Sequence, residues 1–76
     1  MKIPTVKQTR ATVASNILAW RTASGMSQHV LARKAGIDRK TVNRIENGHF
    51  SPSLDTLVRL AKVQQKHPTQ YFKGGK

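Results

Sequence analysis

The chain has 76 residues, contains no cysteine, and carries 14 Lys and Arg residues against three acidic residues, for a formal net charge of +11 at pH 7. This length allows one domain with a modest core, and the lack of cysteine excludes disulfides and thiolate metal sites. No apolar stretch is as long as a membrane span or a signal-peptide core. We therefore expect one cytoplasmic domain that does not enter a membrane.

The excess of positive charge indicates a polyanionic partner, because self-repulsion opposes compaction and binding a polyanion offsets it. Nucleic acid is the favoured partner, and an anionic membrane surface or a merely solvated surface are the alternatives. The three acidic residues are separated along the chain. Asp38 and Asp55 lie where helices are predicted to begin, and Glu46 lies within a predicted helix. No pair of carboxylates remains for acid–base catalysis, so hydrolase chemistry is not expected.

Residues 1–9 are predicted to form a flexible basic arm, because they contain Pro4 and two lysines without hydrophobic periodicity. A disordered terminus and a segment that touches the phosphate backbone or a minor groove are both compatible with this composition. A first helix is predicted from Arg10 to Ser24, where apolar residues repeat at spacings of four and three. Trp20 lies on that apolar face and is expected to pack in the core.

Residues 27–48 hold the central pattern of the chain, two short helices joined by a tight turn. The first helix is predicted over Gln28–Ala35 and the second over Arg39–Asn47. The Ser and Asp residues that precede these helices suit helix N-termini, and the glycines at the turn and after the second helix suit backbone with positive φ. This is a helix-turn-helix pattern, whose second helix can enter the major groove of DNA.

The second helix of this pattern has an apolar face and a cationic face. Val42 and Ile45 point inward at a spacing of three. The opposite side contains no acid and carries Arg39, Lys40, Asn43 and Arg44, with Thr41 at its margin. An exposed helix face that serves solubility alone usually mixes Glu with Lys. We therefore interpret the outward face as a surface that contacts DNA bases.

After a loop over residues 49–53, another helix is predicted to begin behind Ser53. Its predicted apolar face comprises Leu54, Leu57, Val58, Leu60, Ala61 and Val63. A polar exit over residues 64–66 precedes a short last helix that starts at a proline. Three aromatic residues are candidates either for packing within the subunit or for a dimer contact: Phe50, Tyr71 and Phe72. Residues 74–76 are predicted to be a frayed tail.

Between residues 27 and 53 the chain contains several short motifs at characteristic spacings: Ser27-Gln28, Leu31-Ala32, Ala35-Gly36, Ile45-Glu46-Asn47-Gly48 and Pro52-Ser53. With these motifs the chain resembles the lambda-repressor-like, Cro/CI-type (XRE) helix-turn-helix family over residues 10–73. The resemblance implies an all-α fold, a compact five-helix bundle with the helix-turn-helix in helices 2 and 3. Gln64 and Lys66 depart from it, since relatives usually carry apolar residues there, and this affects how the last helix docks.

The resemblance also implies a role for each matching residue. Base edges would be contacted by Arg39, Lys40, Asn43 and Arg44, with the phosphate backbone as the alternative for Arg44. The DNA backbone would be contacted by Ser27, Gln28, Thr41, Asn47 and His49. Gln28 would also brace the second helix of the motif from the neighbouring first helix. Arg21 would form an ion pair with Glu46 that holds the first helix to the third. Because Arg and Lys can bind the O6 and N7 acceptors of guanine, we expect operator half-sites that contain guanine.

These observations predict a sequence-specific transcriptional regulator, a repressor that occupies a double-stranded DNA operator as a homodimer. Two alternatives stay open: an antitoxin that binds a protein toxin and autoregulates its operon, and a charge-driven binder without sequence preference. An enzyme, a cofactor and a metal site are not expected. The histidines (His29, His49 and His67) lack metal-ligand spacing, and the chain has no glycine-rich phosphate loop.

Overall fold

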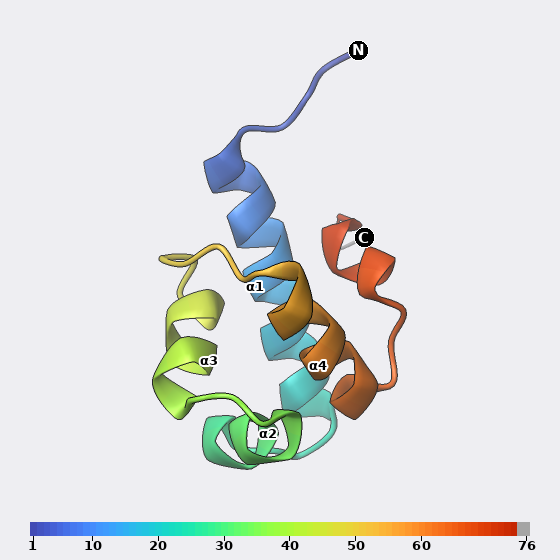
Figure 1. Ribbon diagram of the computed structural model, residues 1–76. Helices are drawn as coiled ribbons and strands as arrows, with labels where there is room; N and C mark the ends of the chain where they lie inside the picture. Colours follow the sequence, from blue (N-terminus) through green and yellow to red (C-terminus); the bar gives the residue numbers. More distant parts are fainter. Residues whose placement is uncertain (75–76) are drawn as a thin grey trace.

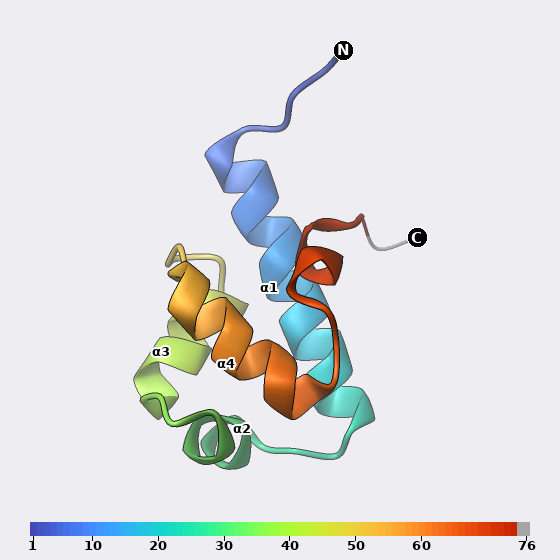
Figure 2. The same ribbon diagram turned by 45° about the vertical axis from the view of Figure 1, so that its right-hand side comes forward.

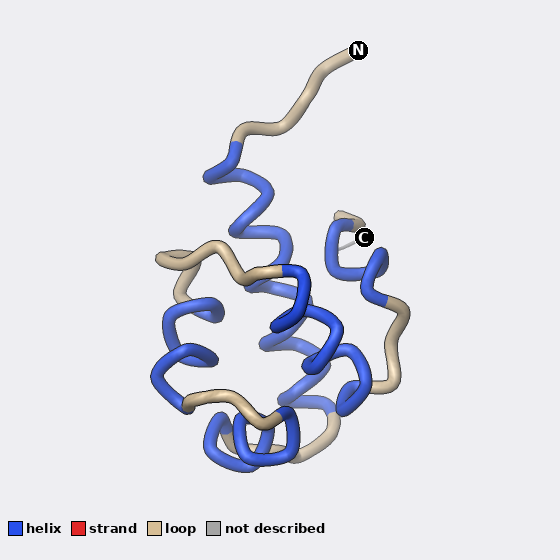
Figure 3. The backbone as a smooth tube through the Cα atoms, in the orientation of Figure 1, coloured by secondary structure: helices blue, strands red, loops and turns tan. Residues whose placement is uncertain are grey.

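The computed structural model describes residues 1–74, which form four α-helices and a short 3-10 helix (Figures 1 and 3). In chain order these are α1 (Val6–Ala23), α2 (Gln28–Ala35), α3 (Arg39–Glu46), α4 (Leu54–Gln64) and the 3-10 helix η1 (Pro68–Phe72). The described residues contain no strand and no helix that is long and apolar enough to cross a membrane. The predicted all-α class is therefore confirmed, and the helix-turn-helix lies in α2 and α3.

The predicted fifth helix begins at Pro68 as expected, but it is a five-residue 3-10 helix and not an α-helix. Such helices have poorer hydrogen-bond geometry than α-helices and are used in short pieces. Of the tail predicted over residues 74–76, residues 75–76 lie outside the described residues.

Helix α1 begins at Val6, one turn before the predicted start at Arg10. The Thr5 hydroxyl accepts a hydrogen bond from the Gln8 amide at 3.0 Å, and the Gln8 side chain accepts one from the Thr5 amide at 2.9 Å. This reciprocal pair is a capping box, which satisfies two of the free N–H groups at a helix start. The predicted arm of residues 1–9 is therefore too long, since residues 6–9 are helical and only residues 1–5 precede the helix.

The core is formed by side chains from all five elements. Its least exposed members are Ile17 from α1, Leu31 from α2, Val42 and Ile45 from α3, Leu60 from α4, and Tyr71 from η1. Full burial of an aliphatic side chain of this size stabilises the fold by about 1.5–3 kcal/mol. The apolar face predicted for α4 was too wide. Leu54 and Val58 are 76% and 41% exposed. Residues four apart lie on the same side of a helix, and the side of α4 that carries these two residues points outward.

Hydrogen bonds attach η1 to the helices on which it packs (Figure 2). The Gln64 amide donates to the Ile17 carbonyl at 3.1 Å and accepts from the Tyr71 hydroxyl at 2.7 Å. Asn16 in α1 donates to the Tyr71 carbonyl at 2.8 Å. Gln64, which was predicted to belong to a polar exit, is therefore a core residue, and its side chain links α1, α4 and η1.

Tyr71 closes the core and is not a dimer contact, because its side chain is 0% exposed. The Trp20 ring packs beside it, with ring centroids 5.3 Å apart, so Trp20 occupies the packing position predicted for it. Lys66 places its ammonium group 4.8 Å from the centroid of the Trp20 ring, a distance at which a cation is attracted to the ring face. Gln64 thus holds η1 against α1 and α4, and Lys66 adds a contact with Trp20 of α1.

Burial raises the pKa of the Tyr71 phenol above its usual value of about 10. Below that pH the phenol is protonated in both states. Above it the unfolded chain loses the proton while the folded chain retains it. The free energy of unfolding should therefore fall with rising pH, by at most about 1.4 kcal/mol per pH unit from this group. Denaturant titrations between about pH 9 and 11 should show a shallower decline for Tyr71→Phe.

Tyr71 is the chain's single tyrosine, so the difference between the two proteins isolates one phenol. Near pH 7, Tyr71→Phe should also lower the free energy of unfolding by about 1–3 kcal/mol, because the buried Gln64 oxygen loses its donor. The same alkaline decline in both proteins would contradict the assignment of a raised pKa to Tyr71.

Candidate DNA interface

The turn between α2 and α3 sets the relative position of the two helices. Gly36 has φ 70°, a left-handed conformation that glycine adopts with little strain, and the Ile37 amide then donates to the Ala32 carbonyl at 2.9 Å. At the start of α2, the Ser27 hydroxyl accepts from the Val30 amide at 3.1 Å. Asp38 occupies the N-cap position of α3, but its side chain makes no capping hydrogen bond.

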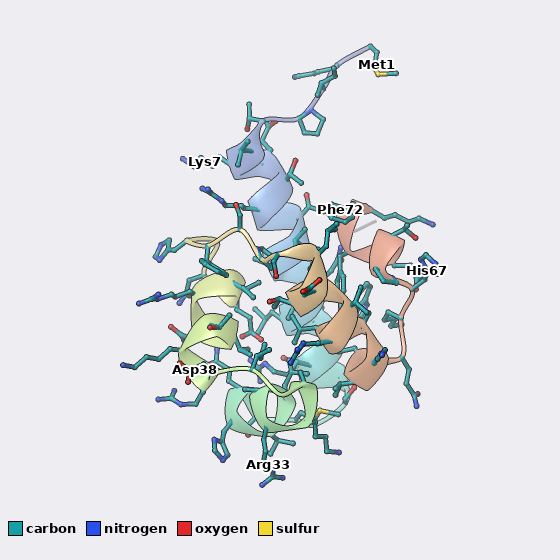
Figure 4. The ribbon with its side chains drawn as sticks, viewed as in Figure 1. Met1, Lys7, Arg33, Asp38, His67 and Phe72 are labelled. Carbon is teal, nitrogen blue, oxygen red and sulfur yellow. The ribbon has the colours of Figure 1, made fainter. Side chains whose placement is uncertain are left out.

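The inner and outer faces of α3 separate as the sequence predicted. Val42 and Ile45 are 0% and 1% exposed and fix the helix in the core. The predicted base-contacting residues are all exposed: Arg39, Lys40, Asn43 and Arg44. Figure 4 shows nitrogen-tipped side chains projecting outward from α3, with Asp38 at its lower end. The structure thus brings these four residues onto one accessible helix.

The residues predicted to contact the DNA backbone lie around the same helix. Ser27, Asn47 and His49 are exposed, whereas Gln28 and Thr41 are half-buried. Ser27 precedes α2, and His49 follows α3 with its amide bonded to the Arg44 carbonyl at 3.0 Å. The Ser27 hydroxyl is already used as a helix cap. A phosphate contact there would therefore need the remaining capacity of that hydroxyl, or a neighbouring backbone amide.

The ion pair implied between Arg21 and Glu46 is present. Arg21 Nε donates to Glu46 Oε2 at 2.6 Å and Arg21 Nη2 donates to Glu46 Oε1 at 2.9 Å. Their side chains are 14% and 4% exposed. The hydrogen bonds to Glu46 raise the pKa of Arg21 above its already high usual value. Arg21 Nη1 also donates to the Met26 carbonyl at 2.8 Å, so one guanidinium ties α1 to α3 and to the loop before α2.

A second set of contacts joins this ion pair to the exposed face of α3. Gln28 Nε2 donates to Glu46 Oε1 at 2.8 Å, and Gln28 Oε1 accepts from Asn43 Nδ2 at 3.3 Å. Asn43 Oδ1 in turn accepts from Asn47 Nδ2 at 3.2 Å. The resemblance implied that Gln28 braces α3, but the particular partners were not predicted, because they are brought together from α2 and α3 by tertiary packing and follow no local spacing.

An apolar cleft of about 330 Å³ lies apart from the outer face of α3. Its walls come from the start of α1, the loop before α4, the start of α4 and the end of η1: Pro4, Val6, Thr9, Arg10, Val13, Ser51, Pro52, Leu54, Leu57 and Phe72. Phe72 is 50% exposed and lies above α4 in Figure 4. Phe50 is 37% exposed and is not part of the lining. Among residues 1–74 no cluster of His, Asp or Glu could hold a metal ion.

A family model described as Helix-turn-helix, HTH_3, matches residues 17–70. This chain belongs to the HTH_3 helix-turn-helix family. An uncharacterized HTH-type transcriptional regulator of Archaeoglobus fulgidus is 37% identical over 49 residues, which are 64% of this chain and 70% of that relative.

Two solved structures have a similar fold. A hypothetical transcription factor from Neisseria has a TM-score of 0.85 and 27% identity, over 99% of this chain and 86% of the other. The restriction-modification controller protein C.AhdI from Aeromonas hydrophila has a TM-score of 0.79 and 32% identity, over 83% and 96% of the two chains. Together with the family match, these likenesses identify an XRE-type DNA-binding transcription regulator. They do not favour the antitoxin alternative.

Proposed function

We propose that this HTH_3 protein binds a specific operator in double-stranded DNA as a homodimer and represses transcription by occupying it. The observation that carries the proposal is the outer face of α3. It presents four exposed side chains that can donate hydrogen bonds and no acid, while the inner face is locked into the core. A rigid helix of this kind can place donors against base edges in the major groove. Occupying an operator requires only affinity, so repression needs no further activity.

In the proposed complex the residues divide into two groups. Arg39, Lys40, Asn43 and Arg44 contact bases. Ser27, Gln28, Thr41, Asn47 and His49 contact phosphates or sugars and fix the register of α3 on the duplex. The net charge of +11 supports fast, salt-dependent association with DNA. Specificity then comes from α3, because arginine and lysine can bind the two acceptors of guanine.

The partner proposed for the apolar cleft is a second copy of this chain. Leu54, Phe72 and Val6 expose large apolar side chains at the cleft, and apolar surface of this kind is characteristic of interfaces. Two copies that each carry +11 repel one another. Residues 50–58 contain no Lys or Arg and one acid, so this segment adds no like charge to the proposed contact, and Arg10 is the one cation in the cleft wall. We propose Phe72, in the cleft wall, and Phe50, which directly precedes Ser51 of that wall, as the dimer contacts.

Selection of bound sequences from random duplex DNA tests the proposed function. We expect a palindromic consensus whose half-sites lie about 10 base pairs apart, centre to centre, because a two-fold dimer presents its two recognition helices one helical turn apart. Each half-site should contain a fixed guanine. A bound pool without any enriched sequence would show charge-driven binding instead, and an enriched A/T-only core would contradict the proposed roles of the arginines and lysine.

A pair of matched variants in the same selection tests the dimer surface. Phe72→Glu places a charge in the cleft and should abolish the palindromic spacing while leaving the half-site sequence unchanged. Leu18→Glu is the control, because Leu18 is also exposed, at 41%, and does not line the cleft. The same consensus from both variants would show that the second copy binds elsewhere.

A further inference from the structure

We infer that the buried carboxylate of Glu46 fixes the orientation of the exposed Asn43 amide, and thereby sets which base pair α3 accepts at the position that Asn43 faces. This inference rests on the proposed function and goes further, because it assigns a positioning role to groups that never touch DNA bases. It concerns three side chains that connect the buried ion pair to the outer face of α3: Gln28, Asn43 and Asn47.

The hydrogen bonds between these groups all run in one direction. Asn47 donates to Asn43, Asn43 donates to Gln28, and Gln28 donates to Glu46. The series ends at a carboxylate whose side chain is 4% exposed and which also accepts two hydrogen bonds from Arg21. The polarity of the whole series is therefore set at its buried end.

The reason is that an ionised carboxylate only accepts hydrogen bonds, whereas an amide has one donating end and one accepting end of nearly the same shape. Gln28 must turn its NH₂ group toward Glu46, which leaves its oxygen facing Asn43. Asn43 must then turn its NH₂ group toward Gln28. Its own oxygen faces Asn47, one turn further along the chain. If any of these amides were reversed, two donors or two acceptors would face each other.

This leaves Asn43 with one N–H and one oxygen lone pair in fixed places, because the network uses one of its two hydrogens and one of its two lone pairs. Adenine offers a matching acceptor at N7 and donor at N6 in the major groove. A reversed Asn43 amide would present the same groups in the opposite order. By excluding the reversed amide, the network makes Asn43 selective for one orientation of an A·T pair.

The test compares base preferences, position by position, between the wild-type protein and two matched variants. Gln28→Met removes the link between Asn43 and the carboxylate and keeps the Arg21–Glu46 pair. Asn47→Ala removes the other hydrogen bond of Asn43 but leaves that link in place. Each variant also loses one proposed phosphate contact, which lowers the affinity for all sequences alike. The position that Asn43 faces is the one whose preference disappears in Asn43→Ala.

At that position Gln28→Met should reduce the preference for adenine about tenfold, whereas Asn47→Ala should leave it within about twofold. Preferences at the guanine positions should not change in either variant. A wild-type selection without a consensus would overturn the proposed function and this inference with it. A consensus whose adenine position is equally sharp in Gln28→Met, or that Asn43→Ala does not alter anywhere, would overturn this inference alone.

Discussion

Glu46→Ala should lower the free energy of unfolding by about 3–5 kcal/mol, because it leaves the Arg21 guanidinium partly buried without its counter-charge. The same change removes the acceptor for Gln28, so a second donor loses its partner. A chain of this size has a total stability of only about 4–11 kcal/mol. The variant should therefore be largely unfolded, or close to it, at temperatures where the wild-type protein is folded.

The measurement is thermal unfolding followed by circular dichroism, with an expected decrease in Tm of at least about 12 °C. Asp55→Ala is the matched control. It also replaces an acid by alanine, but Asp55 is exposed in the first turn of α4, so it should cost at most about 1 kcal/mol. The double variant Arg21→Met/Glu46→Met should recover much of the loss, because it removes both charges and keeps apolar volume. Equal Tm values for Glu46→Ala and Asp55→Ala would contradict a structural role for the pair.

The Arg21–Glu46 pair was predicted from the family resemblance, whereas the helices were predicted from local patterns in the sequence. Local patterns located α2 and α3 and their N-cap positions, because helix caps and inward-facing apolar spacing involve residues only a few positions apart. The start of α1 could also have been predicted from the local sequence. Thr5 and Gln8 have the spacing of a capping box, but the prediction followed apolar periodicity, which begins later.

Other features could not have been predicted from local pattern. Gln64 appears polar and terminal in the sequence, yet it is 7% exposed, because the Ile17 carbonyl and the Tyr71 hydroxyl satisfy its amide. Burial of an amide depends on such partners, and they lie 47 and 7 residues away along the chain. For Gln28 the resemblance implied a contact with α3, but its two partners there, Glu46 and Asn43, follow no local spacing. Polar residues of this kind are assigned correctly only once the helices are packed.

Arg39→Ala should weaken binding to the selected operator by about 1–3 kcal/mol, or roughly 5- to 150-fold, because it removes a bidentate donor from guanine O6 and N7. Binding to unrelated duplex DNA should weaken much less, so the ratio of specific to non-specific affinity should fall. Titrations of labelled duplexes by fluorescence anisotropy, carried out at several salt concentrations, measure both quantities. The preference for guanine at one position should disappear in the variant.

The decisive comparison is with Lys62→Ala, which removes the same formal charge from an exposed residue in the last turn of α4. That end of α4 lies on the other side of the molecule from α3 (Figures 1 and 2). If net charge alone determined binding, both variants would lose affinity equally for every duplex. If α3 reads bases, Lys62→Ala should retain the operator preference of the wild-type protein while Arg39→Ala loses it. Equal losses would therefore refute sequence-specific recognition by α3, even with the fold and the family unchanged.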